Sequence, residues 1–388
     1  MKVGFVGLGA RIANVGAYFK AHKSDMDFVA YVDPTPSGLP HVRKYAGSEP
    51  AQYETLQEML NREKLDLLMI GSPNFMHIEH LRIALQSDVP QIFAEKPIVV
   101  SEEETFELLE LMKAHGGVKR VLVGLVLRYS PLYVALRKSL DSGQIGKIAS
   151  IEAAEHIGPY HGSFFMRDWR RYTKYSGGFM LEKCCHDLDL YQGVVGQRPR
   201  YVSSFGGRKS FVPENQPETR EKFPQPDAGD RVDPFTPRWG GGNADFESDG
   251  DIIDYQTALV EYEDGANLCF HTNIFVPDEF RRFAVMGTKG MAEGDFIRNY
   301  YKVHDAFTSR CLIDMPEVGQ GHSGHYGADD GMARDLVAYF ENGGDLPVSV
   351  LDALEAGLTA IKMDEARKSR SVIDMTETWQ RFDSYGLV

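Results

Sequence analysis

Two cysteines, a histidine and several acidic residues stand close together in GGFMLEKCCHDLDL, the stretch that runs from Gly177 to Leu190. Three kinds of chemistry use such residues: metal binding, attack by a cysteine thiolate, and proton transfer by a histidine base. Adjacent cysteines lack the spacing of a structural zinc site, and nothing in the sequence predicts surroundings that stabilise a thiolate. We therefore interpret Cys184 and Cys185 as small buried apolar residues and predict no metal site.

His186 is the strongest candidate for chemistry in this stretch. The pKa of a histidine side chain lies near neutrality, so an imidazole can take a proton from an alcohol. If residues 179–193 form one helix, Glu182 and His186 share a face of it, and the carboxylate can orient a substrate or assist the proton transfer. The alternative is a histidine satisfied within the core. For one of Asp187 and Asp189 we favour a capping or solvent-exposed role on the helix.

The elements that must position this chemistry begin with a strand, a glycine turn and a helix. Lys2 to Val6 has the composition of a short buried strand, and GLGARIA follows it directly. Gly7 permits the tight turn, Gly9 lets the backbone approach a pyrophosphate, and the helix N-terminus supplies N–H donors. Ile12 stands where the third glycine of G-x-G-x-x-G is expected. Taken alone, the loop also fits a glycine-rich turn of any α/β protein.

Asp33 narrows the choice of cofactor. It ends the second predicted strand, residues 28–32, about 20 residues beyond the glycine motif, where a carboxylate accepts from the ribose 2′-OH. The same carboxylate repels the extra phosphate of NADP. We therefore predict NAD as the cofactor, with NADP as the alternative because Arg43 could compensate the charge.

Strand and helix patterns keep alternating after Asp33, which predicts a doubly wound parallel sheet. Ligands of such sheets bind at the carboxyl ends of the strands, where Gly7, Asp33, residues 72–74, residues 95–97 and Arg128 all lie. The further predicted strands are 65–70, 91–94 and 121–127, and the predicted helices are 12–21, 77–86 and 101–113.

Several motifs together resemble the glucose–fructose oxidoreductase / inositol dehydrogenase family. They are GLGARIA (7–13), SPNFMH (72–77), EKP (95–97), LRYSP (127–131), DWRR (168–171), SGGFMLEKCCHDLDL (176–190) and GHYGADD (324–330). Ile12 is usual at its position in that family. The resemblance implies a Rossmann domain over residues 1–127 and a second domain, residues 128–388, built on a large, mostly antiparallel open sheet. In the family this sheet forms the floor of the substrate site and often the dimer contacts.

The sequence of the second part is compatible with such a sheet. Residues 262–266 read as a hairpin turn. Residues 206–250 are rich in Pro, Gly and acidic residues and interrupt the sheet. Such a loop is either a surface excursion that packs on a partner subunit or a lid that carries Arg231, Arg238 and Trp239 near the site. The segments that alternate like half-buried strands are 148–157, 252–262, 266–275 and 281–287.

The resemblance also implies roles for individual residues. Lys96 alone would be interpreted as a surface lysine, but within EKP it is a predicted catalytic residue together with His186 and Glu182. The family usually has Asp where Glu182 stands, which suggests a substrate pocket different from that of plain inositol dehydrogenases. The implied cofactor-binding residues are Gly7, Gly9, Ala10, Arg11, Ile12, Asp33, Ser72, Pro73, Asn74, His77, Glu95 and Lys96. The implied substrate-binding residues are Arg128, Tyr160, Asp168, Trp169, Arg170 and His325; Tyr160 and Trp169 otherwise belong to the core, and His322 and His325 otherwise lie in a mobile turn.

Composition excludes several classes of partner. The chain has 388 residues, enough for two domains, and a net charge of −14, which argues against a surface that follows nucleic-acid phosphates. The sequence has neither the pattern of a signal peptide nor an apolar run long enough to span a membrane. The four cysteines lack C-x-x-C spacing, which is typical of a reducing compartment. We predict a cytoplasmic protein that binds neither nucleic acid nor membranes.

These observations predict an NAD-dependent dehydrogenase of a sugar, sugar derivative or cyclitol. Lys96 would polarise the reacting hydroxyl and His186 would remove its proton. The open sheet favours a homodimer or homotetramer. Three alternatives remain: an NAD-dependent glycoside hydrolase or lyase of the same fold that acts through transient oxidation, a non-catalytic nucleotide-binding regulator, and a cofactor-independent sugar-binding module.

Overall fold

The computed structural model describes residues 1–387 except 219–222, 225–230, 233–244 and 320–323. The described chain divides into two compact units. The first unit contains Met1–Pro131, His322–Leu358 and Glu377–Val388, and the second contains Leu132–Gly321 and Thr359–Thr376. The sequence predicts one domain over residues 128–388; by their contacts, two later segments of the chain group with the first unit.

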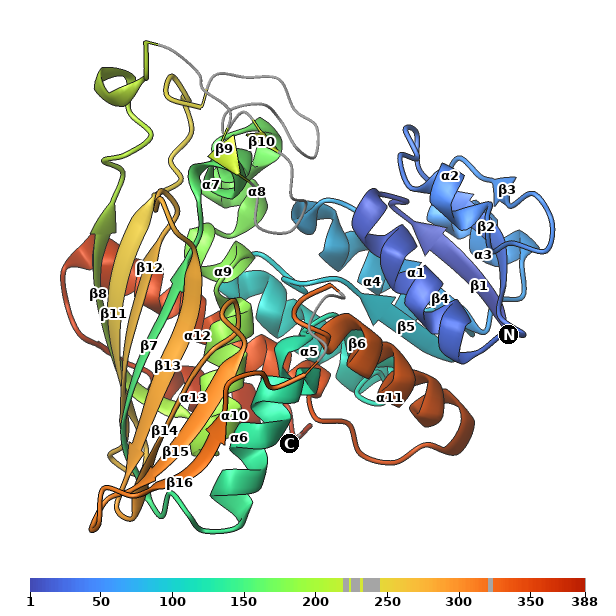
Figure 1. Cartoon of the computed structure of the whole chain (residues 1–388). Helices are drawn as coiled ribbons and strands as arrows, with labels where there is room; N and C mark the ends of the chain where they lie inside the picture. Colours follow the sequence, from blue (N-terminus) through green and yellow to red (C-terminus); the bar gives the residue numbers. More distant parts are fainter. Residues whose placement is uncertain (219–222, 225–230, 233–244, 320–323, 388) are drawn as a thin grey trace. The chain divides into compact units, whose positions relative to one another are not determined.

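A parallel sheet forms the centre of the first unit (Figure 1). Its six described strands follow the order β3-β2-β1-β4-β5-β6, and every neighbouring pair is parallel. The inner strands β1 (Lys2–Val6), β4 (Leu67–Ile70) and β5 (Gln91–Ala94) are almost entirely buried. The strand order reverses between β1 and β4, and ligands bind at such a reversal. The predicted Rossmann sheet is confirmed.

Two helices from opposite ends of the chain pack side by side in the first unit (Figure 1). They are α1 (Ala10–His22) and α11 (Ala328–Asn342). Phe19 of α1 makes edge-to-face contacts with Phe93 of β5 and Phe340 of α11, with ring centroids 5.5 and 5.9 Å apart. This shared apolar contact explains why the chain returns to the first unit. The other elements here are β2 (Asp27–Val32), α2 (Leu39–Val42), β3 (Ala51–Gln52), α3 (Leu56–Arg62), η1 (Asn74–Met76), α4 (His77–Leu85), α5 (Glu102–His115), β6 (Val121–Val123), η2 (Leu127–Tyr129) and α13 (Thr376–Asp383), and α12 (Val350–Ser369) runs across the division between the units.

The second unit contains an open sheet with the order β16-β15-β14-β13-β7-β12-β11-β8-β17 among the described residues. Neighbouring strands are antiparallel except β12 and β7, which confirms the mostly antiparallel sheet. β11 (Tyr255–Tyr262) and β12 (Asn267–Asn273) alternate between buried and exposed residues and are joined by the predicted hairpin turn at Gly265, with φ +88°. The other strands are β7 (Ile148–His156), β8 (Pro199–Gly207), β13 (Phe280–Gly287), β14 (Gly290–Asp295), β15 (Tyr300–Asp305), β16 (Cys311–Met315) and β17 (Ile373–Asp374), with a separate pair β9 (Phe223–Pro224) and β10 (Arg231–Val232).

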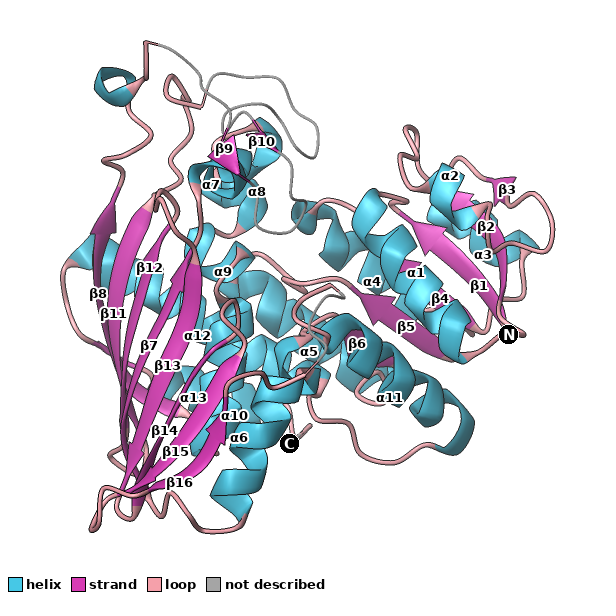
Figure 2. Ribbon diagram, in the orientation of Figure 1, coloured by secondary structure: helices cyan, strands magenta, loops and turns pink. Residues whose placement is uncertain are grey.

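Helices cover one face of this sheet (Figure 2). The single helix considered over residues 179–193 is not formed: α9 (Phe179–Glu182) ends before Lys183, and α10 (Cys185–Val195) begins after Cys184. Glu182 and His186 therefore lie on two consecutive helices. In the described part of the chain, no helix is both long and apolar enough to cross a membrane. The remaining helical segments are α6 (Pro131–Asp141), α7 (Pro159–Phe165), η3 (Asp168–Arg171), α8 (Thr173–Ser176) and η4 (Pro213–Asn215).

The predicted interruption of the sheet lies between the end of β8 at Gly207 and the start of β11 at Tyr255. Its described end is attached to the segment before η3, where Arg167 and Asp245 form a buried ion pair. Arg238 and Trp239, predicted for a lid, lie outside the described residues.

Candidate active site

The two glycines of the first loop serve different purposes. Gly7 has φ +74°, and a Cβ atom there would lie 2.2 Å from the backbone nitrogen of Ser72, so the fold itself requires glycine. Gly9 has an ordinary extended backbone at the N-terminus of α1, and a Cβ atom there would meet no atom within 4 Å. No protein atom therefore requires glycine at position 9. The open space at this helix N-terminus suits a phosphate group held by backbone N–H donors.

Ile12 replaces the third glycine of the motif without loss of close packing. That glycine normally allows the helix to approach the strand. Here the small residue is on the other side of the contact, because a Cβ atom added to Gly71, after β4, would lie 2.5 Å from the Cβ of Ile12. The close contact between helix and strand therefore requires a glycine at position 71, after β4, and not at position 12 of the helix.

The carboxylate of Asp33 is held beside the glycine loop. Its Oδ2 accepts a hydrogen bond of 2.6 Å from the backbone nitrogen of Leu8, and its Oδ1 accepts one of 2.7 Å from that of Thr35. Arg43, which was considered as a compensating cation, donates to Glu49 over 2.9 Å. Its charge is therefore offset by another carboxylate.

His77 links the turns that follow β4 and β5. Its Nδ1 lies 2.8 Å from the carbonyl oxygen of Pro97, and its Nε2 lies 2.9 Å from that of Ser72. Only a doubly protonated ring donates to both oxygens. The Ser72 hydroxyl contacts Nδ1 of His80 at 2.9 Å, and burial together with the nearby His77 lowers the pKa of His80 to about 4. Asn74 is buried at the start of η1, and Pro73 precedes it.

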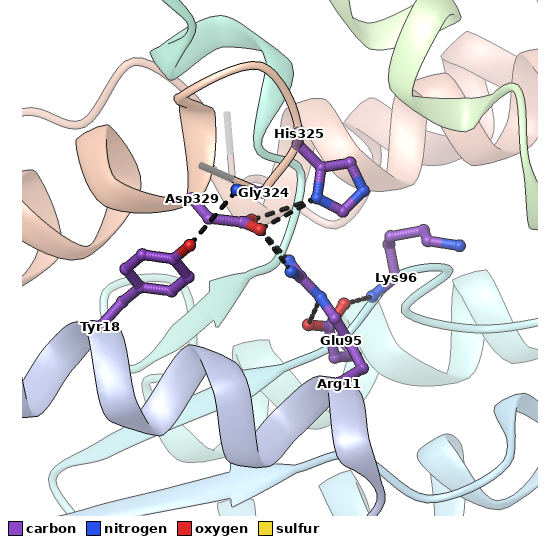
Figure 3. A network of polar contacts seen from close by, with 7 residues as sticks. All are labelled: Arg11, Tyr18, Glu95, Lys96, Gly324, His325 and Asp329. Carbon is purple, nitrogen blue, oxygen red and sulfur yellow. Dashed lines mark hydrogen bonds and ion pairs between the residues drawn. The ribbon is translucent and has the colours of Figure 1, made fainter. Parts of the chain in front are cut away.

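Arg11, at the start of α1, joins three parts of the first unit (Figure 3). Its Nε donates to Oε1 of Glu95 over 2.8 Å, and its terminal nitrogens donate to both oxygens of Asp329 over 2.7 and 2.8 Å. The other oxygen of Glu95 accepts from the Lys96 backbone nitrogen at 3.3 Å, and Nδ1 of His325 lies 3.1 Å from Asp329. We call Arg11, Glu95, Asp329 and His325 the first-unit cluster. The Lys96 side chain extends away from Glu95 (Figure 3).

The charges of the first-unit cluster support one another. Burial alone would raise the pKa of Asp329, but His325 and Arg11 hold that pKa well below its usual range. Arg11 keeps a raised pKa despite its own burial, because Glu95 and Asp329 favour the charged form. The guanidinium predicted to bind the cofactor is thus engaged by two carboxylates. Asp329 was missed in the sequence, since Arg11 lies 318 positions away from it.

Glu182 and His186 are both buried in the second unit, and Glu182 lies beside a stacked arginine. The guanidinium carbon of Arg170 lies 4.0 Å from the ring centroid of Phe164 and 4.1 Å from that of Trp169. Cation–π contacts of this kind fix an arginine side chain in place. Its Nε lies 3.6 Å from Oε1 of Glu182, and burial lowers the pKa of Arg170 while Glu182 opposes that change. Of the predicted site residues, Trp169, Arg170 and Glu182 are thus brought together.

Two predicted substrate-binding residues have partners within the protein. Tyr160 is only 4% exposed, and its hydroxyl donates to Glu279 over 2.9 Å. Arg128 is buried and donates to the Pro347 carbonyl and to Asp352 over 3.1 and 3.3 Å. Asp168 has φ +48°, and its carbonyl accepts a hydrogen bond from Arg171. His322 lies outside the described residues.

The remaining residues of GGFMLEKCCHDLDL are buried rather than solvated. The predicted solvent-exposed role for Asp187 or Asp189 is wrong, because both are buried and Asp187 pairs with Arg281. Cys184 and Cys185 are buried as predicted, and burial raises the pKa of Cys184, which opposes thiolate formation. Among the described residues, no three His, Cys, Asp or Glu side chains form a group that could hold a metal ion.

Comparison with protein families accounts for most of the chain. An oxidoreductase family with an NAD-binding Rossmann fold matches residues 1–124, and the C-terminal alpha/beta domain of the same oxidoreductase family matches residues 137–375. A solved structure of a levoglucosan dehydrogenase in complex with NADH and levoglucosan shares the fold, with a TM-score of 0.75 and 17% identity, over 97% of this chain and 99% of that one.

Curated relatives have low sequence identity. A putative oxidoreductase, YteT, of Bacillus subtilis is 25% identical over 354 residues, 80% of this chain and 81% of its own length. An inositol 2-dehydrogenase of Rhizobium meliloti is 25% identical over 53% of this chain and 58% of its own length. A 2,7-anhydro-N-acetylneuraminate hydratase of Mediterraneibacter gnavus is 26% identical over 39% of each chain.

Proposed function

Because the chain belongs to the glucose–fructose oxidoreductase / inositol dehydrogenase family, we propose that it is an NAD-dependent dehydrogenase of a sugar, sugar derivative or cyclitol. The observation that carries the proposal is the open space at Gly9 on a sheet whose carboxyl edge also holds Asp33 and Lys96. A dinucleotide and a cationic side chain on the same edge are the components of hydride transfer from an alcohol.

The proposed roles follow from the chemistry of the side chains. The Lys96 ammonium hydrogen-bonds the reacting hydroxyl and favours loss of its proton, and His186 takes that proton as the general base. Bound NAD would accept the hydride from the same carbon. Glu182, whose carboxylate lies beside the stacked Arg170, orients the substrate, and Asp168 and Trp169 contribute to the same polar surface.

We propose NAD rather than NADP as the preferred cofactor. Both oxygens of Asp33 accept backbone hydrogen bonds, which hold the carboxylate at the end of β2, and Arg43 is paired with Glu49. A fixed negative charge there repels a 2′-phosphate. Asp33→Ser should therefore narrow the preference for NAD over NADP, measured as the ratio of the two kcat/KM values. An unchanged ratio would place the discrimination elsewhere.

The glycine loop offers a matched test of the cofactor site. Gly9→Ala should leave the urea midpoint unchanged and weaken NADH binding at least about tenfold, because only the ligand needs the open space. Gly116→Ala is the control for a glycine distant from this loop; with φ +65° it should lower stability slightly and leave NADH affinity unchanged. NADH titration by fluorescence measures both. Full affinity in Gly9→Ala would contradict the proposed cofactor site.

The reaction itself is tested with NAD, and separately NADP, against inositols, aldoses, sugar acids and glycosides. NADH absorbance and substrate consumption are followed together. NADH formation with one class of polyol identifies the substrate, and His186→Ala should then lose nearly all turnover while it keeps its affinity for NADH. A His186→Ala enzyme with full turnover would rule out the proposed base.

A second candidate is a lyase, hydratase or glycoside hydrolase that uses NAD without net reduction. The similarity to a curated hydratase favours keeping this candidate. Loss of a glycoside or an anhydro sugar with no change in NADH absorbance would identify it. NADH binding without either signal would point to a nucleotide-binding regulator, and absence of NADH binding to a sugar-binding module.

We also propose a homodimer or homotetramer. Large apolar side chains lie exposed on one face of neighbouring strands of the open sheet, among them Phe205 of β8 at 68% and Leu259 of β11 at 54% exposure. Exposed apolar surface of this kind favours association. Light scattering after gel filtration tests this, and Leu259→Lys should shift the protein toward the monomer.

A further inference from the structure

Four charged side chains meet between the open sheet and the helices of the second unit. Glu155 on β7 and Arg281 on β13 stand directly opposite each other in the antiparallel register. Arg281 Nε lies 3.1 Å from one oxygen of Glu155, and Lys183 Nζ lies 3.0 Å from the other. Arg281 also donates to both oxygens of Asp187, over 2.9 and 2.6 Å. We call these four residues the second-unit cluster.

The second-unit cluster is buried and electrically balanced. Arg281 is 1% exposed, Glu155 and Asp187 are equally buried, and only the Lys183 side chain reaches 13% exposure. Two carboxylates and two cations leave no formal net charge when all four are ionised. A buried ionic group is tolerated when its charges are paired with good geometry, as the two-pronged contact between Arg281 and Asp187 provides.

The cluster residues alternate with the proposed catalytic residues along the chain. Lys183 follows Glu182, and Asp187 follows His186. The side chains of Lys183 and Asp187 make the ionic contact with the sheet. The residue before each of them, Glu182 or His186, belongs to the proposed site. The short break between α9 and α10 falls within this stretch, at Lys183 and Cys184. Whatever sets the position of Lys183 and Asp187 therefore also sets that of Glu182 and His186.

We propose that Glu155 and Arg281 are positioning residues, which fix the register of α9 and α10 on the sheet and so hold Glu182 and His186 in place for proton transfer. This inference rests on the proposed function of His186. Apolar contacts alone leave a helix several similar packings on a sheet. A planar guanidinium that donates to one carboxylate through Nε and a terminal nitrogen, with a second carboxylate 3.1 Å from Nε, accepts only one register.

The test removes the ions without leaving an unpaired charge. In the fourfold variant Glu155→Met, Lys183→Met, Asp187→Leu, Arg281→Met the cluster becomes apolar, a type of replacement that often preserves or raises stability. The expected result is a folded protein with unchanged NADH affinity, a KM within a few fold of wild type, and a kcat lower by about 100-fold, because small displacements of catalytic groups have effects of that size. The control, Lys302→Gln with Asp314→Asn, removes an exposed ion pair between β15 and β16 and should leave kcat unchanged.

A second variant and a spectroscopic signal protect the test against misfolding. Arg281→Lys keeps the charge but loses the two-pronged contact, so kcat should fall about tenfold. In histidine-labelled protein, the ring signal of His186, assigned by its loss in His186→Gln, should shift or broaden in both variants and stay unchanged in the control. Wild-type kcat or an unchanged His186 signal in the folded fourfold variant would overturn the proposal. A shifted signal in a protein whose wild type reduces no NAD would instead reject the proposed dehydrogenase and keep the positioning role.

Discussion

The two ionic clusters hold proposed catalytic residues in different ways. The first-unit cluster lies partly in solvent, with Arg11 and His325 side chains 33% and 30% exposed, and it connects residues from opposite ends of the chain. The second-unit cluster is almost completely buried and lies between two strands and two short helices. One contains a histidine, and the other contains none.

This difference indicates what each cluster is suited for. Solvent reaches the Arg11 and His325 side chains of the first-unit cluster, so its contacts can respond to salt. The second-unit cluster is already balanced and excluded from solvent, so it serves as a rigid support. We expect changes in the second-unit cluster to affect stability strongly, and changes in the first-unit cluster to affect it less and in a way that depends on salt.

The largest expected effect is that of Arg281→Met alone. The variant leaves two buried carboxylates with one cation, and unpaired buried charges of this kind lower the free energy of unfolding by about 3–5 kcal/mol. Urea unfolding at pH 7 measures the loss. Adding Asp187→Leu removes the excess charge and should restore part of the stability. A double variant no more stable than Arg281→Met would show that charge balance is not the cause.

Arg11→Met should have a smaller effect, about 2 kcal/mol in the free energy of unfolding. Asp329 loses two charge-assisted hydrogen bonds but keeps its contact with His325, and solvent reaches this cluster. The same urea experiment provides the comparison. Equal losses for Arg11→Met and Arg281→Met would contradict the distinction between a solvated and a buried cluster.

The two acidic residues should respond to pH with opposite sign. The folded-state pKa of Asp329 lies below its ordinary value of 3.8, so its contribution to stability is present above that value and is lost as the pH falls. Burial raises the pKa of Asp187 from 3.8 to about 6, so its contribution is present below 3.8 and is lost as the pH rises through 6.

Unfolding free energies of Asp329→Asn and Asp187→Asn between pH 3 and pH 7, each subtracted from wild type, measure these contributions. The free-energy difference between wild type and Asp329→Asn should become smaller as the pH falls toward 3. The difference between wild type and Asp187→Asn should become smaller as the pH rises from 4 to 6. Parallel curves for the two variants would refute the assigned shifts.

The smallest expected effect is that of salt. Raising NaCl to 1 M shortens the screening length to about 3 Å, which weakens contacts that solvent reaches. The loss caused by Arg11→Met should therefore decrease by some tenths of a kcal/mol, while that caused by Arg281→Met should not change. Urea unfolding of both variants at low and high salt measures these changes. The exposed ion pair between Arg137 and Asp141 serves as the reference for a contact that salt screens.

The sequence predicted those features that depend on neighbouring residues. The glycine turn, the parallel sheet and the alternation of β11 and β12 each follow from local spacing. Both family domains were also recognisable from short motifs. The substitution of Gly71 for the third glycine could not be predicted, because it depends on which residue faces Ile12 across the sheet.

The ionic partners of the proposed catalytic residues were missed for the same physical reason. Asp187 pairs with Arg281 across 94 positions, and Arg11 pairs with Asp329 across 318. A charged residue on a short helix is usually solvated, and only the tertiary fold shows that a strand presents the opposite charge to it. The break between α9 and α10 likewise opposes the regular spacing of the sequence.

The return of α11 to the first unit has a consequence for synthesis of the protein. Domains generally fold as units while the chain is being made, beginning at the N-terminus. Here the sheet that forms the NAD-binding unit is complete in sequence by Val123, but Phe340 and Asp329, which contact Phe19 and Arg11, are translated more than 200 positions later. During synthesis, the apolar face of α1 that carries Phe19 therefore stays uncovered after the Rossmann sheet is complete. It is covered only when nearly the whole second unit has left the ribosome.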